Sequence, residues 1–144
     1  ALVKAYSDDF FAEIVYKKKT MPHAVEALEY LSSKYNLYIL SNGFRELQEQ
    51  KMRSAGVDKY FKKVVLSEDI GVHKPFPEIF YFAMSATQSE LHTSLMIGDN
   101  WENDIAGAKD AGLGQVFYNV KKTTKFSFQP TGIIEDWNEI GKIL

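Results

Sequence analysis

Residues 96–108 read MIGDNWENDIAGA, and this stretch is the most informative part of the chain. A short apolar run, Ser94 to Ile97, is typical of a buried strand and ends abruptly at Gly98-Asp99. A second acid follows at Asp104, where we expect a helix to begin. Crowded carboxylates repel one another unless a cation is bound, and oxygen ligands suit a hard ion such as Mg²⁺. The alternative is a capped turn, because Asp and Asn are good helix N-caps.

Apolar runs that are typical of strands alternate with helical patterns along the chain, which predicts an α/β fold with a parallel sheet. The expected strands span residues 36–40, 63–66, 95–97 and 115–118. The expected helices span residues 2–16, 22–31, 44–55, 77–86, 104–111 and 135–144. The continuous apolar run at residues 37–40 suits a strand that is covered on both faces.

Composition excludes several classes of partner and site. At 144 residues the chain is most simply one domain. Its net charge of −2 gives no electrostatic reason to expect nucleic acid or an anionic membrane, and no apolar run approaches the 18 residues of a membrane span. Since the chain has no cysteine, disulfides and thiolate metal sites are excluded. These features lead us to expect a cytoplasmic protein.

Two further segments carry candidate chemistry. Ser41-Asn42-Gly43 follows an expected strand, where a hydroxyl and neighbouring backbone N–H groups can hold an anionic oxygen. The alternative is a plain turn, because all three residue types are common in turns. Pro75 restricts Lys74 to an extended conformation, so that the lysine can point back over the sheet edge as a fixed positive charge. The alternative for Lys74 is a lysine in a surface loop.

The order and spacing of these segments say more than any one of them. Lys74 follows Ser41 by 33 positions, Asp99 follows Lys74 by 25, and Asp104 comes 5 positions later. Together they resemble the last three motifs of the haloacid dehalogenase superfamily, most of whose members are Mg²⁺-dependent phosphatases. The matching stretches are Leu40-Ser41-Asn42-Gly43, Gly71-Val72-His73-Lys74-Pro75 and Ile97-Gly98-Asp99 with Asp104, flanked by residues 77–80 and 108–114. The resemblance covers nearly the whole chain after about residue 22.

The resemblance implies a Rossmann-like, three-layer, doubly wound parallel sheet and a role for each matching residue. Ser41, with the backbone N–H of Asn42, would hold a phosphoryl oxygen. Lys74 would neutralise charge on the phosphoryl group and on a nearby carboxylate. Asp99 would bind Mg²⁺ directly or through water, and Asp104 would orient Lys74 or a metal-bound water. The implied substrate is a small phosphorylated metabolite.

The family's first motif, an Asp-x-Asp at the end of the first strand, has no match in this chain. In relatives one Asp is the nucleophile that forms an aspartyl-phosphate, and the other is the general acid/base. Asp8-Asp9 follows a segment without strand character, so we interpret it as the polar face of a helix. Relatives with this layout carry a helical cap between the first motif and the serine motif. We therefore interpret residues 1–19 as a remnant of the cap and residues 20–144 as a core that lacks its first strand.

The absent strand has consequences for folding and for catalysis. In the family it lies between the serine-bearing strand and the strand that ends at Asp99, so its loss would leave unpaired backbone groups that cost about 1–3 kcal/mol each. We expect a missing N-terminal segment of the same protein to supply it. Without a covalent nucleophile the 144 residues alone would be inactive, although the parent protein would be a phosphatase.

Two other classes of function remain as alternatives. A catalytically incomplete relative that binds a phosphorylated ligand or a protein partner is compatible with the absent nucleophile. A receiver domain of two-component signalling uses similar groups, but its acid pair follows the first strand and its lysine comes late, whereas Lys74 here precedes Asp99. Dinucleotide binding is not indicated, because no Gly-x-Gly-x-x-Gly follows an expected strand.

Overall fold

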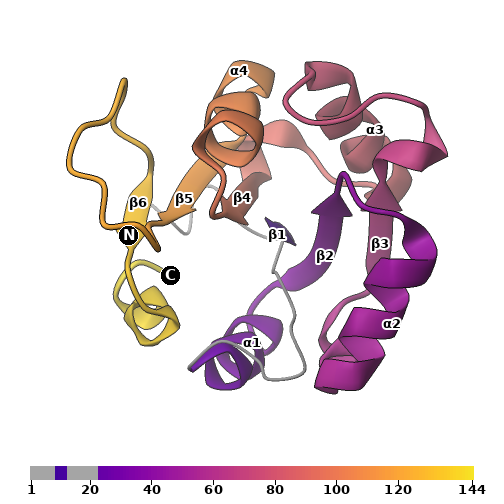
Figure 1. The fold of residues 1–144 in the computed structure, drawn as a ribbon, viewed down its shortest axis with the longest axis horizontal. Coiled ribbons are helices and arrows are strands. Elements are labelled where there is room, and N and C mark those ends of the chain that lie inside the picture. The colour runs from indigo at the N-terminus through magenta and orange to yellow at the C-terminus, as the bar shows by residue number, and fades with distance from the viewer. Residues whose placement is uncertain (1–8, 13–22) are drawn as a thin grey trace.

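Six parallel strands form one sheet at the centre of the described chain, which comprises residues 9–12 and 23–144 of the computed structural model. Their order is β3-β2-β1-β4-β5-β6, so the sheet extends in both directions from β1 (Figure 1). This is the arrangement of a doubly wound sheet, and it confirms the predicted fold class. The strands are β1 (Asp9–Ala12), β2 (Asn36–Ser41), β3 (Lys63–Leu66), β4 (Ser94–Gly98), β5 (Gly114–Tyr118) and β6 (Gly132–Ile134).

Helices cover both faces of this sheet, which gives the three layers that were expected (Figure 1). They are α1 (Ala24–Ser32), α2 (Arg45–Ala55), α3 (Pro77–Thr87) and α4 (Gly107–Ala111), with a π-helical turn at Trp101–Ala106 and a 3-10 segment at Trp137–Lys142. Within this described part of the chain, no helix has the length and apolar character needed to cross a bilayer.

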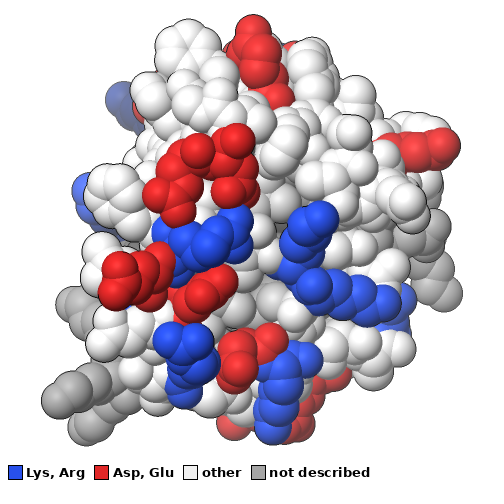
Figure 2. All heavy atoms as spheres, turned by 90° about the vertical axis from the view of Figure 1, so that its right-hand side faces the viewer, with Lys and Arg blue, Asp and Glu red and all other residues white. Residues whose placement is uncertain are grey.

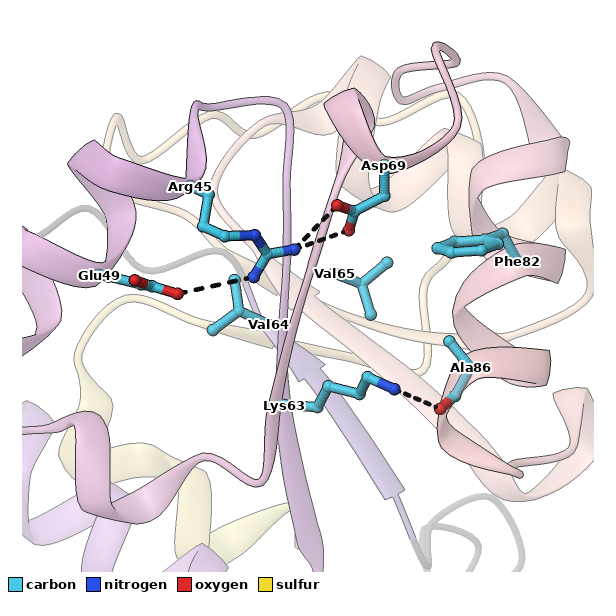
Figure 3. Close-up of a pocket in the computed structure, with 8 residues that line it drawn as sticks. All are labelled: Arg45, Glu49, Lys63, Val64, Val65, Asp69, Phe82 and Ala86. Carbon is cyan, nitrogen blue, oxygen red and sulfur yellow. Dashed lines mark hydrogen bonds and ion pairs between the residues drawn. The ribbon is translucent and has the colours of Figure 1, made fainter.

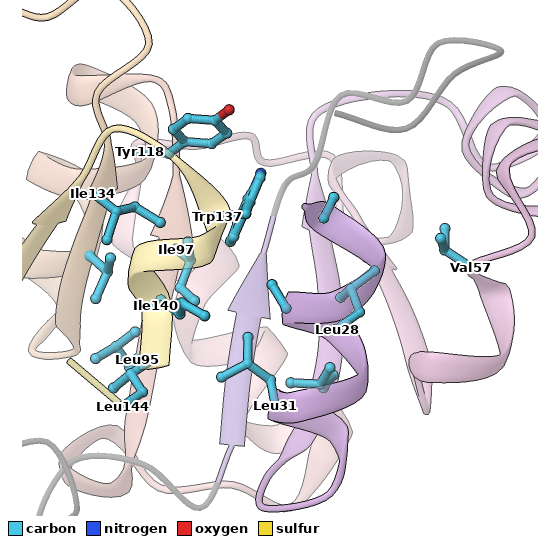
Figure 4. Close-up of a cluster of buried hydrophobic side chains, with 14 of the residues drawn as sticks. Leu28, Leu31, Val57, Leu95, Ile97, Tyr118, Ile134, Trp137, Ile140 and Leu144 are labelled. Carbon is cyan, nitrogen blue, oxygen red and sulfur yellow. The ribbon is translucent and has the colours of Figure 1, made fainter. Parts of the chain in front are cut away.

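The side chains of β2 divide between two hydrophobic clusters because successive residues of a strand point to opposite faces. Leu37 and Ile39 pack in the cluster that includes α1 and the 3-10 segment near the C-terminus. Figure 4 shows other members of this cluster on these elements. Tyr38 and Leu40 pack in the other cluster, against α3 and α4. All four side chains are buried. The prediction of a strand covered on both faces is thus confirmed.

The centre of the sheet differs from the expectation. Residues 9–12 form β1, which pairs in parallel with residues 36–39 of β2 on one side and 94–97 of β4 on the other. The helix expected over residues 2–16 is therefore wrong at these residues, and the expected gap between β2 and β4 is filled. The segment reads DFFA, and aromatic residues favour strands where two open edges offer backbone partners. Asp9 belongs to β1, so its interpretation as part of a helix face is wrong, and residues 9–12 belong to the sheet and not to a cap. Asp8 and the proposed boundary at residue 19 lie outside the described residues, so the rest of the cap remnant stays a prediction.

The remaining differences are one short strand and the starting points of two helices. β6 was not expected, because three residues at the sheet edge are too short to show a pattern. α1 begins at Ala24, since its N-cap His23 has a left-handed φ of 64°, and the start that was expected at residue 22 lies outside the described residues. The helix expected from Asp104 begins earlier, as the π-helical turn that starts at Trp101.

Charged contacts hold the edge of the sheet at β3 between α2 and α3 (Figure 3). Arg45 Nη2 lies 2.8 and 3.0 Å from the two carboxylate oxygens of Asp69, and Arg45 Nη1 lies 3.7 Å from Glu49 Oε1. Lys63 Nζ donates a hydrogen bond of 3.0 Å to the carbonyl of Ala86. On the face drawn in Figure 2, acidic and basic side chains stand next to one another. A charged, bridged edge of this kind opposes pairing with foreign strands.

Asp69 makes stability at this edge depend on pH. Burial alone would raise the pKa of Asp69, but the backbone N–H of Leu66 at 2.9 Å and the guanidinium of Arg45 outweigh it and lower the pKa below 3.8. A lowered folded pKa means that the stabilisation is present above about pH 4 and is lost as the pH falls through the folded pKa. We predict that Asp69→Asn lowers the free energy of unfolding by about 0.5–1.5 kcal/mol at pH 7 in urea titrations.

The difference between wild type and Asp69→Asn should shrink as the pH falls below 4. Asp58→Asn, at an exposed acid, is the matched control and should change stability little at either pH. A loss in Asp69→Asn that persists undiminished at low pH would contradict this account of the β3 edge.

Candidate active site at the carboxyl edge of the sheet

The predicted site residues come from two strand ends and two connections. β2 ends at Ser41 and β4 ends at Gly98, directly before Asp99. Both strands run parallel to β1, so their carboxyl ends lie at the same edge of the sheet. Lys74 comes from the connection before α3, and Asp104 lies in the π-helical turn after β4.

Lys74 and Asp104 form a buried ion pair at this edge. Lys74 Nζ lies 2.5 Å from Asp104 Oδ1, and both side chains are 0% exposed. Nζ also donates to the carbonyl of Leu40 at 3.2 Å. The alternative of a lysine in a surface loop is therefore wrong. Removing two charges from water is costly, so such a pair is held only where further hydrogen bonds satisfy both groups.

The second oxygen of Asp104 ties the pair to the turn that follows β4. Asp104 Oδ2 accepts a hydrogen bond of 3.1 Å from the backbone N–H of Asn100. Asn100 Oδ1 in turn accepts from the backbone N–H of Asn103 at 2.9 Å. The N-cap of this helical turn is thus Asn100. The capping alternative for the acid-rich stretch thus applies to Asn100, whereas Asp104 forms the ion pair with the buried Lys74.

Asn42 has a contact that the sequence did not indicate. Its side chain donates to the carbonyl of Lys74 at 3.1 Å and accepts from the backbone N–H of Lys74 at 2.8 Å. From the sequence, only the backbone N–H of Asn42 was expected at the site. These two bonds fasten the connection that carries Lys74 to the end of β2, 32 residues earlier in the chain.

Ser41 lies buried under α2. Its Oγ accepts a hydrogen bond of 2.9 Å from the backbone N–H of Gly43 and a short one from Gln48 Nε2. As a hydroxyl it also carries a proton to donate. Gln48 is 8% exposed and was not predicted. The signal that could have found it is a polar residue on the inner face of a helix that starts directly after the serine turn.

Asp99 differs from Asp104 in its surroundings, because it is exposed directly after β4. The pKa of Tyr118, at the end of β5, is raised by burial first and then by the negative charges of Asp136 and Asp99. The negative charge of Asp99 therefore acts on Tyr118, at the end of the neighbouring strand β5. Exposure makes the Asp99 carboxylate accessible to a solvated cation, whereas Asp104 is enclosed.

Gly98 is required by the close approach of Asp104 to β4. A Cβ at position 98 would lie 2.2 Å from Asp104 Oδ2 and 2.5 Å from its Cγ. Gly107 has a related role, because a Cβ there would lie 3.1 Å from Pro75 Cα. The two glycines allow the helical turn and the lysine-bearing connection to pack closely on the sheet edge.

The oxygen donors at this edge fit a magnesium ion in part. Asp99 offers one accessible carboxylate, whereas both oxygens of Asp104 already accept hydrogen bonds. Among the described residues, no three His, Cys, Asp or Glu side chains gather to hold a metal. Mg²⁺ keeps several waters and uses one or two protein carboxylates, so Asp99 fits it as a single direct ligand.

Residues 2–112 match the family model of the haloacid dehalogenase-like hydrolases. The chain belongs to this family. The pyrimidine 5′-nucleotidase YjjG of Escherichia coli is 35% identical over 118 residues, which are 81% of this chain and 51% of that protein. The glyceraldehyde 3-phosphate phosphatase of Methanothermobacter thermautotrophicus is 32% identical over 106 residues, 73% of this chain and 47% of that protein. The chain thus spans about half the length of these haloacid dehalogenase-like relatives.

A solved structure of the family has the same fold. The putative HAD-hydrolase YfnB of Bacillus subtilis, in a form bound to magnesium, superposes with a TM-score of 0.81 at 29% identity. The match covers 88% of this chain and 55% of that chain. The family resemblance that was stated from three short motifs is confirmed by the family model, the relatives and the solved structure.

Substitution of the two acids should separate their roles. We predict that Asp104→Asn lowers the free energy of unfolding by about 3–5 kcal/mol, because it leaves a buried ammonium without its counter-charge. Asp99→Asn, at an exposed position, should change it by less than about 0.5 kcal/mol. Urea unfolding followed by circular dichroism measures both. Equal losses in the two variants would show that burial of Asp104 is not what distinguishes them.

The close contact at Gly98 gives a second prediction. Gly98→Ala should destabilise the fold by about 1–3 kcal/mol, since the new methyl group overlaps Asp104. Gly141→Ala is the matched control, because a Cβ there meets only Tyr30 Cζ at 3.9 Å. Thermal unfolding of both variants is the measurement. If Gly98→Ala unfolds at the same temperature as Gly141→Ala, Asp104 does not pack against β4 as described.

Proposed function

We propose that this chain is part of a Mg²⁺-dependent phosphatase that hydrolyses a small phosphorylated metabolite through an aspartyl-phosphate. The observation that carries the proposal is the buried ion pair of Lys74 and Asp104, held at the sheet edge between Ser41 and Asp99. Phosphoryl transfer asks chiefly for positioning and charge neutralisation, and these are the properties of such an edge.

Each residue has a distinct part in this proposal. Ser41 and the backbone N–H of Asn42 bind a phosphoryl oxygen, and Lys74 neutralises its charge. Asp104 holds the lysine in position through the 2.5 Å contact between Lys74 Nζ and Asp104 Oδ1. Asp99 would hold Mg²⁺, which when bound supplies further charge neutralisation for the phosphoryl oxygens.

The proposed nucleophile is not among the described residues. The 144-residue sequence contains no Asp-x-Asp. The acid of β1, Asp9, pairs with Asn36 and Ser94, which begin β2 and β4, whereas Ser41 and Gly98 end those strands. Asp9 therefore lies at the opposite edge of the sheet from the site. We infer that the nucleophile comes from a segment of the same protein outside these residues, and that the 144 residues alone do not turn over substrate.

The relatives agree with a small phosphorylated substrate. One is a pyrimidine 5′-nucleotidase and another is a glyceraldehyde 3-phosphate phosphatase, so both names refer to small phosphate compounds. The second candidate is a binding-only relative that holds a phosphorylated ligand without hydrolysing it. The sequence favours it only through the lack of an Asp-x-Asp.

The deciding experiment uses the complete reading frame from which this chain derives. We predict that the purified protein hydrolyses members of a broad panel of phosphate monoesters with Mg²⁺, and that EDTA or Asp99→Asn abolishes this activity. Asp110→Asn, at an exposed acid on α4, should retain it. A complete protein without activity on any ester of the panel would favour the binding-only candidate, as would a reading frame that encodes no Asp-x-Asp strand.

A further inference from the structure

A hollow of about 360 Å³ opens directly beside Asp99. One wall comes from the turn after β4 and the other from β5 and the loop that follows it. The lining residues are Asp99, Asn100, Trp101, Glu102, Phe117, Val120, Lys121 and Thr123. Its volume is at the lower end of the range of about 300–1,000 Å³ that is usual for small-molecule sites. We call it the Trp101 hollow.

The aromatic wall of the Trp101 hollow is held in place by a cluster of rings. The ring centroid of Trp101 lies 5.2 Å from that of Phe117 at an interplanar angle of 79°. On the later loop, Phe128 and Phe126 lie 4.7 and 5.2 Å from it. Lys109 Nζ of α4 lies 5.0 Å from the Phe128 ring. An aromatic surface fixed in this way is preformed, which lowers the entropic cost of binding a flat group against it.

The opposite wall also has a defined position. Asn119 is buried at 3% exposure, and its backbone N–H donates a hydrogen bond of 2.7 Å to the carbonyl of Ile134. Its side chain donates to the carbonyl of Thr123 at 2.9 Å and accepts from the backbone N–H of Thr123 at 3.0 Å. The segment that carries Lys121 is therefore closed by two hydrogen bonds at its base.

The lining indicates the chemistry of the occupant. Trp101, Phe117 and Val120 supply apolar surface, while the carboxylates of Asp99 and Glu102 supply hydrogen-bond acceptors. Lys121 supplies donors. A bare anion would face two carboxylates, and a hydrocarbon would face three charged groups. A compact polar ring, with an apolar face and a rim of hydrogen-bonding groups, satisfies both parts of the lining.

We propose that the Trp101 hollow binds the ring-bearing organic part of the phosphate ester, either the sugar or the base of a mononucleotide-sized compound. The inference rests on the proposed function, because Asp99 belongs to both the hollow and the proposed phosphoryl site. Asp99 lines the hollow and directly follows β4, whose carboxyl end lies at the same edge of the sheet as Ser41 at the end of β2. Trp101 and Lys121 thereby select the substrate, and Trp101 is not a catalytic residue.

The test uses the two tryptophans of the chain as reporters in ¹H–¹⁵N NMR titrations. The indole N–H of Trp101 should shift when a ring-bearing ester binds, whereas that of Trp137, 4% exposed in the core, should not. The probes are inorganic phosphate, glycerol phosphate, ribose 5-phosphate, uridine 5′-monophosphate and uridine, each with Mg²⁺. We expect at least one ring-bearing ester to bind about tenfold more tightly than glycerol phosphate.

Two variants then test the assignment. Trp101→Leu should remove the tenfold preference while inorganic phosphate binds as before. Lys121→Ser, at an exposed residue, should weaken the ring-bearing ester several-fold without disturbing the fold. Lys125→Ser, which is exposed but does not line the hollow, is its matched control. The Trp101 variant is read through its Trp137 signal, which reports whether the core is intact.

The outcomes separate the two proposals. Equal affinity for ribose 5-phosphate and uridine 5′-monophosphate assigns the hollow to the sugar, and tighter binding of the nucleotide assigns it to the base. If glycerol phosphate binds as tightly as both, or if the preference survives Trp101→Leu, the inference is overturned while the phosphoryl site stands. If neither inorganic phosphate nor any ester binds, the phosphoryl site fails. A Trp101 shift with uridine would then support the hollow, and no Trp101 shift with uridine would overturn it.

Discussion

The buried ion pair of Lys74 and Asp104 is the constraint on which the arrangement of this site depends. Neither side chain is exposed, so each charge is stable there only because the other lies 2.5 Å away. The lysine also bonds the carbonyl of Leu40 at the end of β2, and the aspartate bonds the N–H of Asn100 after β4. One charge pair thus joins two strand ends that are separated in the sheet by β1.

Several residues without chemistry of their own are explained by this pair. Gly98 is a glycine because a Cβ would overlap Asp104, and Asn42 is an amide because its side chain must both donate to and accept from the backbone of Lys74. Gln48 adds a further buried polar contact, because its side chain donates a hydrogen bond to the Ser41 hydroxyl. Asp99 lies outside this group of buried side chains, and its carboxylate is exposed to solvent. The buried side chains therefore hold Lys74 and Ser41 in position, whereas a ligand from solution would bind at the exposed Asp99.

Local sequence patterns were sufficient for part of this structure, because strands covered on both faces are continuous apolar runs and the site residues stand at strand ends. They failed at β1, where a four-residue segment is a strand only because β2 and β4 offer it backbone partners 27 and 85 positions later. They also missed the side-chain bonds of Asn42 to the backbone of Lys74, because the fold brings together residues that are 32 positions apart. The bond of Gln48 to the Ser41 hydroxyl was missed too, because it depends on which face of α2 turns inward. Asp104 can lie buried against β4 because residue 98 is a glycine, and a sequence motif does not show such packing.

A double-mutant cycle between Lys74 and Asp104 tests this account most directly. Lys74→Met, Asp104→Leu and the double variant would be compared with the wild-type chain by urea unfolding. We predict strong coupling of about 1–3 kcal/mol or more, with the double variant more stable than Asp104→Leu alone, because no uncompensated charge is left buried. If the two single losses add to give the loss of the double variant, Lys74 and Asp104 do not act as one unit, and the pair does not hold the site together.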